Sequence, residues 1–494
     1  MLGLFSGKSD HPLVDPKSAR ELYDRLNRSD PLEVVEEIDS WLESTSSDLQ
    51  IKRQRRVDVM FQLDDIGSAA AAQLAKDYLL LSESGHGQNY KIWQGNSKYW
   101  RQLAHCCHNM IEEFEADKKT QDEMKANLPL LYVRLLRAFR GCLKWDQFRY
   151  GPMDSNMWLQ AGQLYLRAAS FRWLDKKRAI GKGVQTTIEA EYMRLVLFHA
   201  ASMDRLMPPG IELADQLLAH FQPHFSLTKQ VKPDNVYWVD LGKPIAPTRL
   251  ARLPVVSPTL HFFATANART AIEAMRAEIS SSQIVPISLG LTQQFPPAAV
   301  IALLQHLEVF CAPQPPMRLH VRHQVKSLMR VIDGFQSVVA VLQGDTMLGG
   351  SWVVDDVSLR GMRAQVVLGG NDRLGIGSLV ALCPDDAENW LIGVVRRMSK
   401  ESQTQGSVGI ETIGRSPRAV DLNSSGLSGE GLLLESEIVA DEPTMMLVSH
   451  GIWQDFRPVN FELNARRYLL RPLEEQQRGN DFVMARYWVE TQGQ

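Results

Sequence analysis

The sequence predicts a multidomain α+β protein, with a mostly helical N-terminal region, an α+β connector and two β-rich segments. Three observations support this class. The chain has 494 residues, more than one hydrophobic core usually serves, so roughly two to four domains are expected. Apolar residues recur every three to four positions up to about residue 221, whereas apolar and polar residues alternate beyond about residue 313. The domains are predicted over residues 1–221, 222–312, 313–420 and 421–494.

The composition is that of an ordinary globular protein. The formal net charge is −3, with 22% charged and 44% hydrophobic residues, which gives no global reason to expect nucleic-acid or membrane binding. Five scattered cysteines do not form a disulfide framework and fit a reducing compartment. The first residues do not resemble a secretory signal, and no apolar run of about 18 residues occurs. We therefore expect a cytoplasmic protein without membrane insertion.

The N-terminal region is predicted to be a helical bundle or solenoid. Asp30 followed by Pro31 is typical of a helix start. The segment Trp158–Tyr165 fits the opening of a tetratricopeptide repeat. The rest of a repeat does not follow, which favours an ordinary aromatic helix face. In either case the region is expected to bind an unidentified protein partner. Further helices are predicted over residues 55–82, 98–115, 121–143, 155–174 and 185–207.

Three clusters in the helical region suggest metal or nucleic-acid binding, but each is better explained as part of the structure. The sequence His105-Cys106-Cys107-His108 places both histidines on one helix face, but adjacent cysteines diverge by about 100° and cannot join them in a tetrahedral site. Core packing is the preferred interpretation, and no metal is expected. The arginines of two basic clusters are predicted to be solvated rather than bound to nucleic acid: Arg53, Arg55 and Arg56, and Arg134, Arg137 and Arg140.

The connector, residues 222–312, mixes strand and helix signals. Residues 236–241 and 259–263 are predicted to be strands. Residues 267–281 and 297–310 are predicted to be helices, the second opened by proline. The connector contains neither a phosphate-binding loop nor a glycine-rich dinucleotide motif.

The first β-rich segment contains the sequence Asp356-x-Ser358-x-x-Gly361. Apolar residues recur at every second position behind Gly361, which predicts two strands joined by a turn at residues 359–361. Asp356 and Ser358 lie two positions apart on an extended segment, so their side chains are expected on one face. A glycine in this turn provides positive φ or close approach of backbones.

An arginine pair, Arg318 and Arg322, precedes this turn. Guanidinium groups bind phosphate oxygens and guanine edges through two parallel hydrogen bonds. The proline-rich residues 313–316 are predicted to form an extended hinge. By subtraction, 33 residues separate Arg322 from Asp356, and an extended hairpin around residues 344–350 is expected to absorb part of this length. Arginines on a hinge that faces a polar strand edge suggest a clamp for an anionic purine nucleotide.

This pattern, RxxxR followed by DxSxxG, resembles the PilZ domain, a six-stranded β-barrel that commonly binds cyclic di-GMP in bacteria. Residues 393–397 and 408–411 are similar to the closing strands of that family, so the resemblance covers about residues 313–420. It implies that the arginines bind phosphates and guanine faces, that the aspartate and serine contact guanine edges, and that the glycine forms the turn. The implied ligand-binding residues are Arg318, Arg322, Asp356, Ser358 and Gly361. The alternative is that these are solvated strand residues and turn caps without a ligand.

The C-terminal residues 421–494 are predicted to form a further β-rich module. Strands are expected near residues 432–434, 445–448 and 482–488. Ser428-x-x-Gly431 repeats the spacing of Ser358-x-x-Gly361, which suggests a degenerate second module. The acidic position is replaced by Gly426, so no nucleotide is expected to bind there.

The leading functional hypothesis is a cyclic di-GMP receptor of a bacterium, a non-enzymatic signal-transduction protein that relays ligand binding to its helical region. The sequence has none of the common nucleophile, metalloprotease or kinase motifs, so no catalytic residue is predicted. The alternative is an adaptor that binds no nucleotide and scaffolds partners of a pilus, flagellum or other surface organelle. Nucleic-acid binding is a third hypothesis, which the near-neutral charge disfavours.

Overall fold

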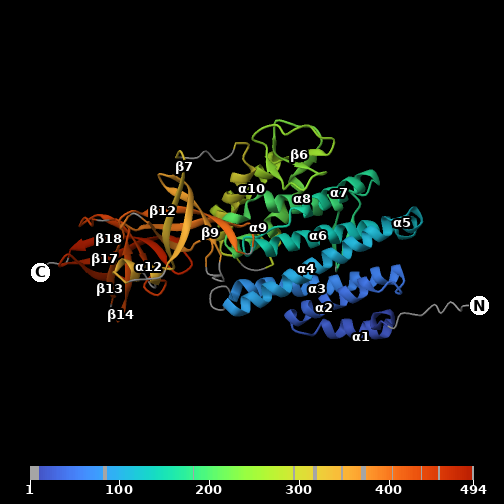
Figure 1. Ribbon diagram of the computed structural model, residues 1–494, viewed down its shortest axis with the longest axis horizontal. Coiled ribbons are helices and arrows are strands. Elements are labelled where there is room, and N and C mark those ends of the chain that lie inside the picture. Colours follow the sequence, from blue (N-terminus) through green and yellow to red (C-terminus); the bar gives the residue numbers. More distant parts are fainter. Residues whose placement is uncertain are drawn as a thin grey trace, which may run out of the picture. The chain divides into compact units, whose positions relative to one another are not determined.

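A computed structural model describes most of the chain, and its elements are shown in Figure 1. The chain forms two compact units, each treated by itself. The first comprises the described parts of residues 1–148, 153–203 and 208–316, and the second those of residues 149–152, 204–207 and 317–494. The described residues are 11–81, 86–181, 183–292, 295–314, 320–345, 349–368, 374–385, 387–402, 404–424, 426–435, 437–453 and 457–491.

The first unit is mainly helical, as predicted. Helices α2, α3, α4 and α6 pack side by side and form its centre (Figure 1). Asp30 caps α2 as predicted, because its carboxylate accepts a hydrogen bond of 2.9 Å from the amide of Leu32. The helices are α1 (Pro16–Leu26), α2 (Pro31–Ser47), α3 (Arg53–Leu81), α4 (His86–Glu115), α5 (Lys118–Met124), α6 (Leu128–Gln147), α7 (Asn156–Ser170), α8 (Ile188–Ala200) and α9 (Pro208–Phe221).

Three predicted helix boundaries are wrong. The single helix expected over residues 121–143 is divided into α5 and α6, because Pro129 lies in the first turn of α6 and lacks the amide that would continue a helix from α5. The helix expected from residue 185 begins at Ile188, after a hairpin of β1 (Arg178–Ile180) and β2 (Val184–Thr186). Helix α4 begins at His86, well before the expected residue 98.

The aromatic side chains of the segment Trp158–Tyr165 on α7 belong to the core. Trp158 and Tyr165 are buried and pack against His199 and Tyr192 of α8. The β1–β2 hairpin follows α7 where a tetratricopeptide repeat would place its second helix. The aromatic helix face is therefore the correct interpretation of this segment.

The interpretation of the two arginine clusters as solvated faces is wrong for the buried Arg56 and Arg134, whereas Arg53 is exposed as predicted. Arg134 on α6 is only 3% exposed and forms ion pairs with Asp64 and Asp65 of α3, the second at 2.8 Å. Arg140 pairs with Asp215 of α9 at 2.5 Å. The acids lie about 70 residues away in sequence, so the pattern on α6 alone did not reveal them. The first cluster makes similar contacts: Arg53 and Arg56 pair with Glu113, and Arg55 donates to the carbonyl of Leu13.

The connector has the predicted elements. A four-stranded sheet has the order β3-β6-β4-β5, and it is followed by two helices. Its elements are β3 (Ser226–Thr228), β4 (Asn235–Asp240), β5 (Thr248–Arg249), β6 (Leu260–Ala264), α10 (Ala266–Ser282) and α11 (Pro297–Cys311).

The second unit contains the predicted six-stranded barrel. Its strands close in the order β10-β11-β12-β9-β8-β7 around buried apolar side chains such as Val354, Ala364 and Val395. The alternation behind Gly361 is confirmed, because Met362 also lies in this core. The strands are β7 (His323–Asp333), β8 (Gly350–Ser358), β9 (Gly361–Val367), β10 (Leu379–Pro384), β11 (Leu391–Lys400) and β12 (Gln405–Gly414).

The C-terminal module is a second closed six-stranded barrel. Each of its strands pairs with the same neighbours as the strand six numbers earlier, so the two barrels share one topology. Ser428 and Gly431 both lie inside β14, which corresponds to β8, so the suggested match to the Ser358–Gly361 turn is wrong. The strands are β13 (Arg418–Ser424), β14 (Leu427–Leu433), β15 (Pro443–Val448), β16 (Val459–Leu463), β17 (Arg466–Arg478) and β18 (Val483–Thr491).

Helix α12 (Phe335–Leu342) lies between β7 and β8 and joins the barrels. Phe335 and Val338 pack in one apolar cluster with Leu432 and Phe482 of the second barrel. This helix absorbs much of the connection between Arg322 and Asp356. The extended hairpin predicted around residues 344–350 falls on residues 346–348, which lie outside the described residues, so it stays a prediction.

Candidate functional site

Asp356 reaches the outer face of the first barrel through an irregularity in β8. The register between β8 and β9 shifts between Val354 and Asp356, which is the pattern of a β-bulge. Val354 and Val357 both pack on the barrel core, which simple alternation would not allow. Asp356 therefore points outward, in register with Arg363 of β9.

Arg322 and Asp356 are in direct contact. The Nη1 atom of Arg322 lies 2.9 Å from Oδ1 and 3.1 Å from Oδ2 of Asp356. Arg322 immediately precedes β7, and β7 pairs with β8, so strand pairing brings the two sequence motifs together. The Arg322 side chain remains 39% exposed, whereas Asp356 as a whole is 7% exposed. The carboxylate is thus covered by a guanidinium that solvent and a ligand can still reach.

Ser358 and Gly361 close the β8–β9 turn. The two residues are paired across the hairpin, and the Ser358 hydroxyl donates a hydrogen bond of 3.0 Å to the carbonyl of Gly361. A Cβ atom on Gly361 would lie 2.6 Å from the carbonyl oxygen of Ile410 on β12. Close approach of two backbones, rather than a positive φ, therefore requires glycine here.

Gly361→Ala is expected to lower the free energy of unfolding by about 1–3 kcal/mol, because a backbone oxygen cannot move away as a flexible side chain would. Urea denaturation of the full chain measures this change. Gly350→Ala is the matched control on β8, because its Cβ would meet nothing closer than Trp352 Nε1 at 3.7 Å. Equal stability of the two variants would contradict the role assigned to Gly361.

The turn is also held by the end of β12 and by the connection that follows it. Arg415 donates a hydrogen bond of 2.6 Å to the carbonyl of Leu359, and the amide of Thr412 donates one of 3.1 Å to the carbonyl of Arg360. Both carbonyls of the two-residue turn are therefore satisfied. A cavity of about 400 Å³ lies at this contact and is lined by Leu359, Arg360, Thr412, Ile413, Gly414, Arg415 and Leu434.

Four of the five predicted site residues are thus placed together on one edge of the barrel: Arg322, Asp356, Ser358 and Gly361. Arg318 lies outside the described residues, as do Pro315 and Pro316 of the predicted hinge. The structure gives no position for Arg318 relative to the other four, and its role stays a prediction.

In the described residues of the second barrel, the corresponding position is apolar. The connection from β14 to β15 corresponds in topology to the β8–β9 turn. Leu432 near the end of β14 and Leu434 just after it are buried in the apolar cluster shared with α12. Leu434 also approaches the position of a Cβ on Gly414 to 3.2 Å. Apolar packing therefore occupies the place that polar side chains have in the first barrel.

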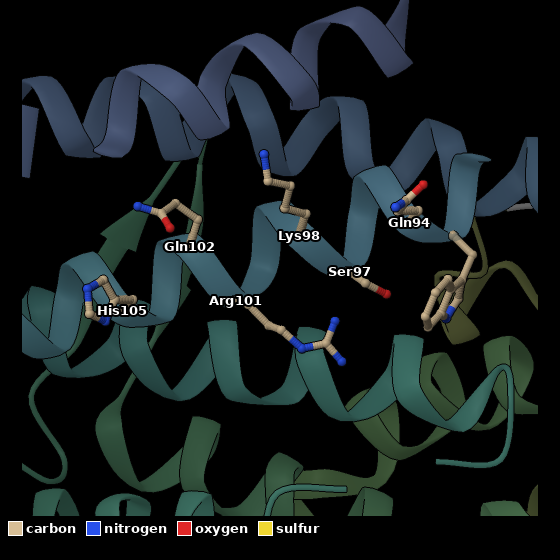
Figure 2. Close-up of a pocket in the computed structure, with 7 residues that line it drawn as sticks. Gln94, Ser97, Lys98, Arg101, Gln102 and His105 are labelled. Atoms are coloured by element: carbon tan, nitrogen blue, oxygen red, sulfur yellow. The ribbon is translucent and has the colours of Figure 1, made fainter. Parts of the chain in front are cut away.

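The helical unit has a second concave feature, a groove of about 480 Å³ along α4 (Figure 2). Lys98 forms an ion pair of 2.6 Å with Asp39 of α2, and Arg101 pairs with Asp146 of α6. Burial raises the pKa of Asp146 to about 6, although Arg101 lowers it. The Ser97 hydroxyl is buried without a hydrogen-bond partner in the described part of the chain. The groove is lined by Trp93, Gln94, Ser97, Lys98, Arg101, Gln102 and His105.

Sequence reasoning did not find this groove. Its residues recur at spacings of four along α4, a pattern that alone suggests a solvated helix face. Nearby, Cys106 and Cys107 are fully buried, in agreement with the core packing predicted for the His105–His108 sequence. Among the described residues, no group of three or more His, Cys, Asp or Glu side chains is arranged to hold a metal ion.

Residues 17–233 match the family model described as the cyclic-di-GMP receptor FimW, N-terminal domain. The FimW match begins in α1, covers the helices through α9 and ends between β3 and β4. It therefore includes the groove on α4 and ends before the first barrel. No curated protein matches the chain. Within the described residues, no helix has the length and apolar character needed to span a bilayer.

Proposed function

We propose that this protein is a cytoplasmic bacterial receptor that binds cyclic di-GMP on its first barrel, which acts as a PilZ domain. The observation that carries the proposal is the Arg322–Asp356 contact beside the Ser358–Gly361 turn, on the outer face of a closed six-stranded barrel. The match of residues 17–233 to the N-terminal domain of a cyclic-di-GMP receptor supports the same ligand from a separate part of the chain. The proposed binding residues are Arg318, Arg322, Asp356, Ser358 and Gly361.

The contact between Arg322 and Asp356 changes the expected binding mechanism. The guanidinium of Arg322 already has a carboxylate partner, that of Asp356. We therefore propose an exchange of partners. A phosphate of cyclic di-GMP takes over the guanidinium of Arg322, whose planar fork suits phosphate oxygens. Asp356 is then available to accept hydrogen bonds from the N–H groups of a guanine edge.

In this exchange the affinity for the ligand depends on how much more strongly Arg322 binds a phosphate than it binds Asp356. An ion pair with a half-exposed arginine contributes only about 0–1 kcal/mol, so a phosphate with two hydrogen bonds can compete with it. The relay to the helical unit would then follow from a difference in affinity, because a ligand favours the arrangement of the protein that it binds more tightly. The α4 groove is the surface that we propose for the protein partner of this relay.

Titration calorimetry of the full chain with cyclic di-GMP tests the proposal. Heat with saturation at micromolar ligand is expected, and GMP at the same concentration is the control, because it lacks the cyclic dinucleotide framework. Absence of heat at micromolar cyclic di-GMP would contradict the receptor function and leave the adaptor hypothesis, in which the helical region scaffolds surface-organelle partners. The ratio of absorbance at 260 and 280 nm of the purified protein detects nucleotide retained during purification.

A further inference from the structure

The outer face of the first barrel carries a row of residues that continues away from Asp356. Strand pairing places Asp356 opposite Arg363 on β9, Arg363 opposite Gly409 on β12, and Gly409 opposite Arg397 on β11. Side chains of directly opposite residues lie on the same face of a sheet, about 4.5–5.5 Å apart at Cβ. The row therefore extends from the proposed clamp across three further strands.

Arg363 has a guanidinium that is exposed and weakly engaged. Its Nη2 atom lies 3.5 Å from the Ser407 hydroxyl, and it forms no ion pair within the described ranges of the chain. The nearest carboxylate in the row, that of Asp356, already accepts from Arg322. Arg363 is thus a cation beside the clamp whose hydrogen-bonding capacity is largely unused.

Gly409 leaves the surface next to Arg363 without a side chain. A Cβ atom there would lie 3.3 Å from the Cβ of Arg397, so even a small side chain would be crowded. Arg397 beyond it is exposed and pairs with Asp204. The strip between the two arginines is bare β12 backbone, low enough for a sugar or a base plane to lie over it.

We propose that Arg363 is a further ligand-binding residue, which contacts a phosphate of cyclic di-GMP lying over Gly409. This proposal rests on the proposed function of the clamp. A cyclic dinucleotide carries two phosphates, and Arg322 is one cation, placed at one end of the row. Arg363 supplies a second cation from β9, the strand paired with β8, and its position inside a strand fixes its backbone.

Titration calorimetry of four variants with cyclic di-GMP tests this role. Arg363→Ala is expected to raise the Kd about tenfold or more, because a charge-assisted hydrogen bond to phosphate is lost. Arg363→Lys keeps the charge without the fork and is expected to give an intermediate Kd. Gly409→Leu fills the bare strip without changing any charge and is also expected to weaken binding. Arg418→Ala removes an exposed arginine at the start of β13 and is the matched control, expected to stay within about twofold of the wild type.

The outcomes separate the two proposals. Wild-type protein without binding overturns the receptor function, and the role of Arg363 with it. Wild-type binding together with unchanged binding in Arg363→Ala overturns the role of Arg363 alone. Equal melting temperatures of Arg363→Ala and Arg418→Ala show that both variants fold, and if Arg363→Ala does not fold, Arg363→Lys and Gly409→Leu decide, with wild-type affinity in both counting against the proposal.

Discussion

Arg322→Ala is expected to weaken cyclic di-GMP binding by about 100-fold while changing the free energy of unfolding by less than about 1 kcal/mol. The loss of affinity follows from removing a guanidinium that would bind phosphate through two charge-assisted hydrogen bonds. The effect on stability is expected to be small because Arg322 is 39% exposed and covers the Asp356 carboxylate, so its truncation opens that carboxylate to water instead of leaving it buried. Calorimetric titration and urea denaturation of the same preparation measure both quantities.

The second barrel provides a matched control for this variant. Arg467 and Arg471 repeat the RxxxR spacing on β17, and Arg471 pairs with Glu490 at 2.7 Å with a side chain 54% exposed. Arg471→Ala therefore removes an ion pair of the same type on a barrel of the same topology, and it is expected to leave affinity unchanged. If Arg322→Ala bound as tightly as Arg471→Ala, the clamp would not be the ligand site.

Arg134→Ala is expected to lower the stability of the helical unit by about 3–5 kcal/mol, the largest loss among the substitutions considered. Arg134 and Asp64 are both buried, and the substitution leaves a buried carboxylate without its counter-ion. Burial raises the pKa of Asp64, whereas the charges of Arg134 and Arg137 lower it. The lowering is the larger effect, so in the intact protein this pKa is below the ordinary value. The pair thus stabilises the fold above the pKa of unfolded aspartate, and this contribution is lost as the pH falls through the folded pKa.

Urea denaturation followed by helical circular dichroism measures this loss. Arg53→Ala is the matched control, because Arg53 also pairs across helices, with Glu113, but is 42% exposed and is expected to change stability by less than about 1 kcal/mol. The double variant Asp64→Ala with Arg134→Ala is expected to lose less than the sum of the single variants. Arg134→Ala with the stability of Arg53→Ala would show that the buried pair does not support the fold.

The first barrel and its turn could be predicted from sequence because their signals are local. Alternating apolar residues around Asp356–Gly361 determine strands, turn and core face within about fifteen positions, and the structure agrees. The bulge before Asp356 was not predicted, since it depends on the pairing of β8 with β9 rather than on composition. The same limit applies to α12, a helix inserted in a β-rich segment whose apolar face is explained only by the second barrel.

The helical region was less predictable in its side chains than in its helices. Periodicity located α2, α3 and α7 approximately. Whether a polar side chain in this region is buried or exposed depends on partners that are distant in sequence. Arg134 is buried because Asp64 on another helix neutralises it, and the α4 groove exists because α2 and α6 flank it. Neither feature has a signal within one helix. The arginine pair before β7 is a mixed case, because Arg322 lies where the motif implied but already has a partner.

The apolar cluster around α12 bears on whether the two barrels can be exchanged separately during evolution. Phe335 on a helix of the first barrel and Leu432 and Phe482 of the second barrel share one core. A chain that acquired the first barrel alone would expose that surface to water, which favours aggregation. Recombination is therefore expected to transfer the two barrels as one module, in which each barrel covers an apolar surface of the other.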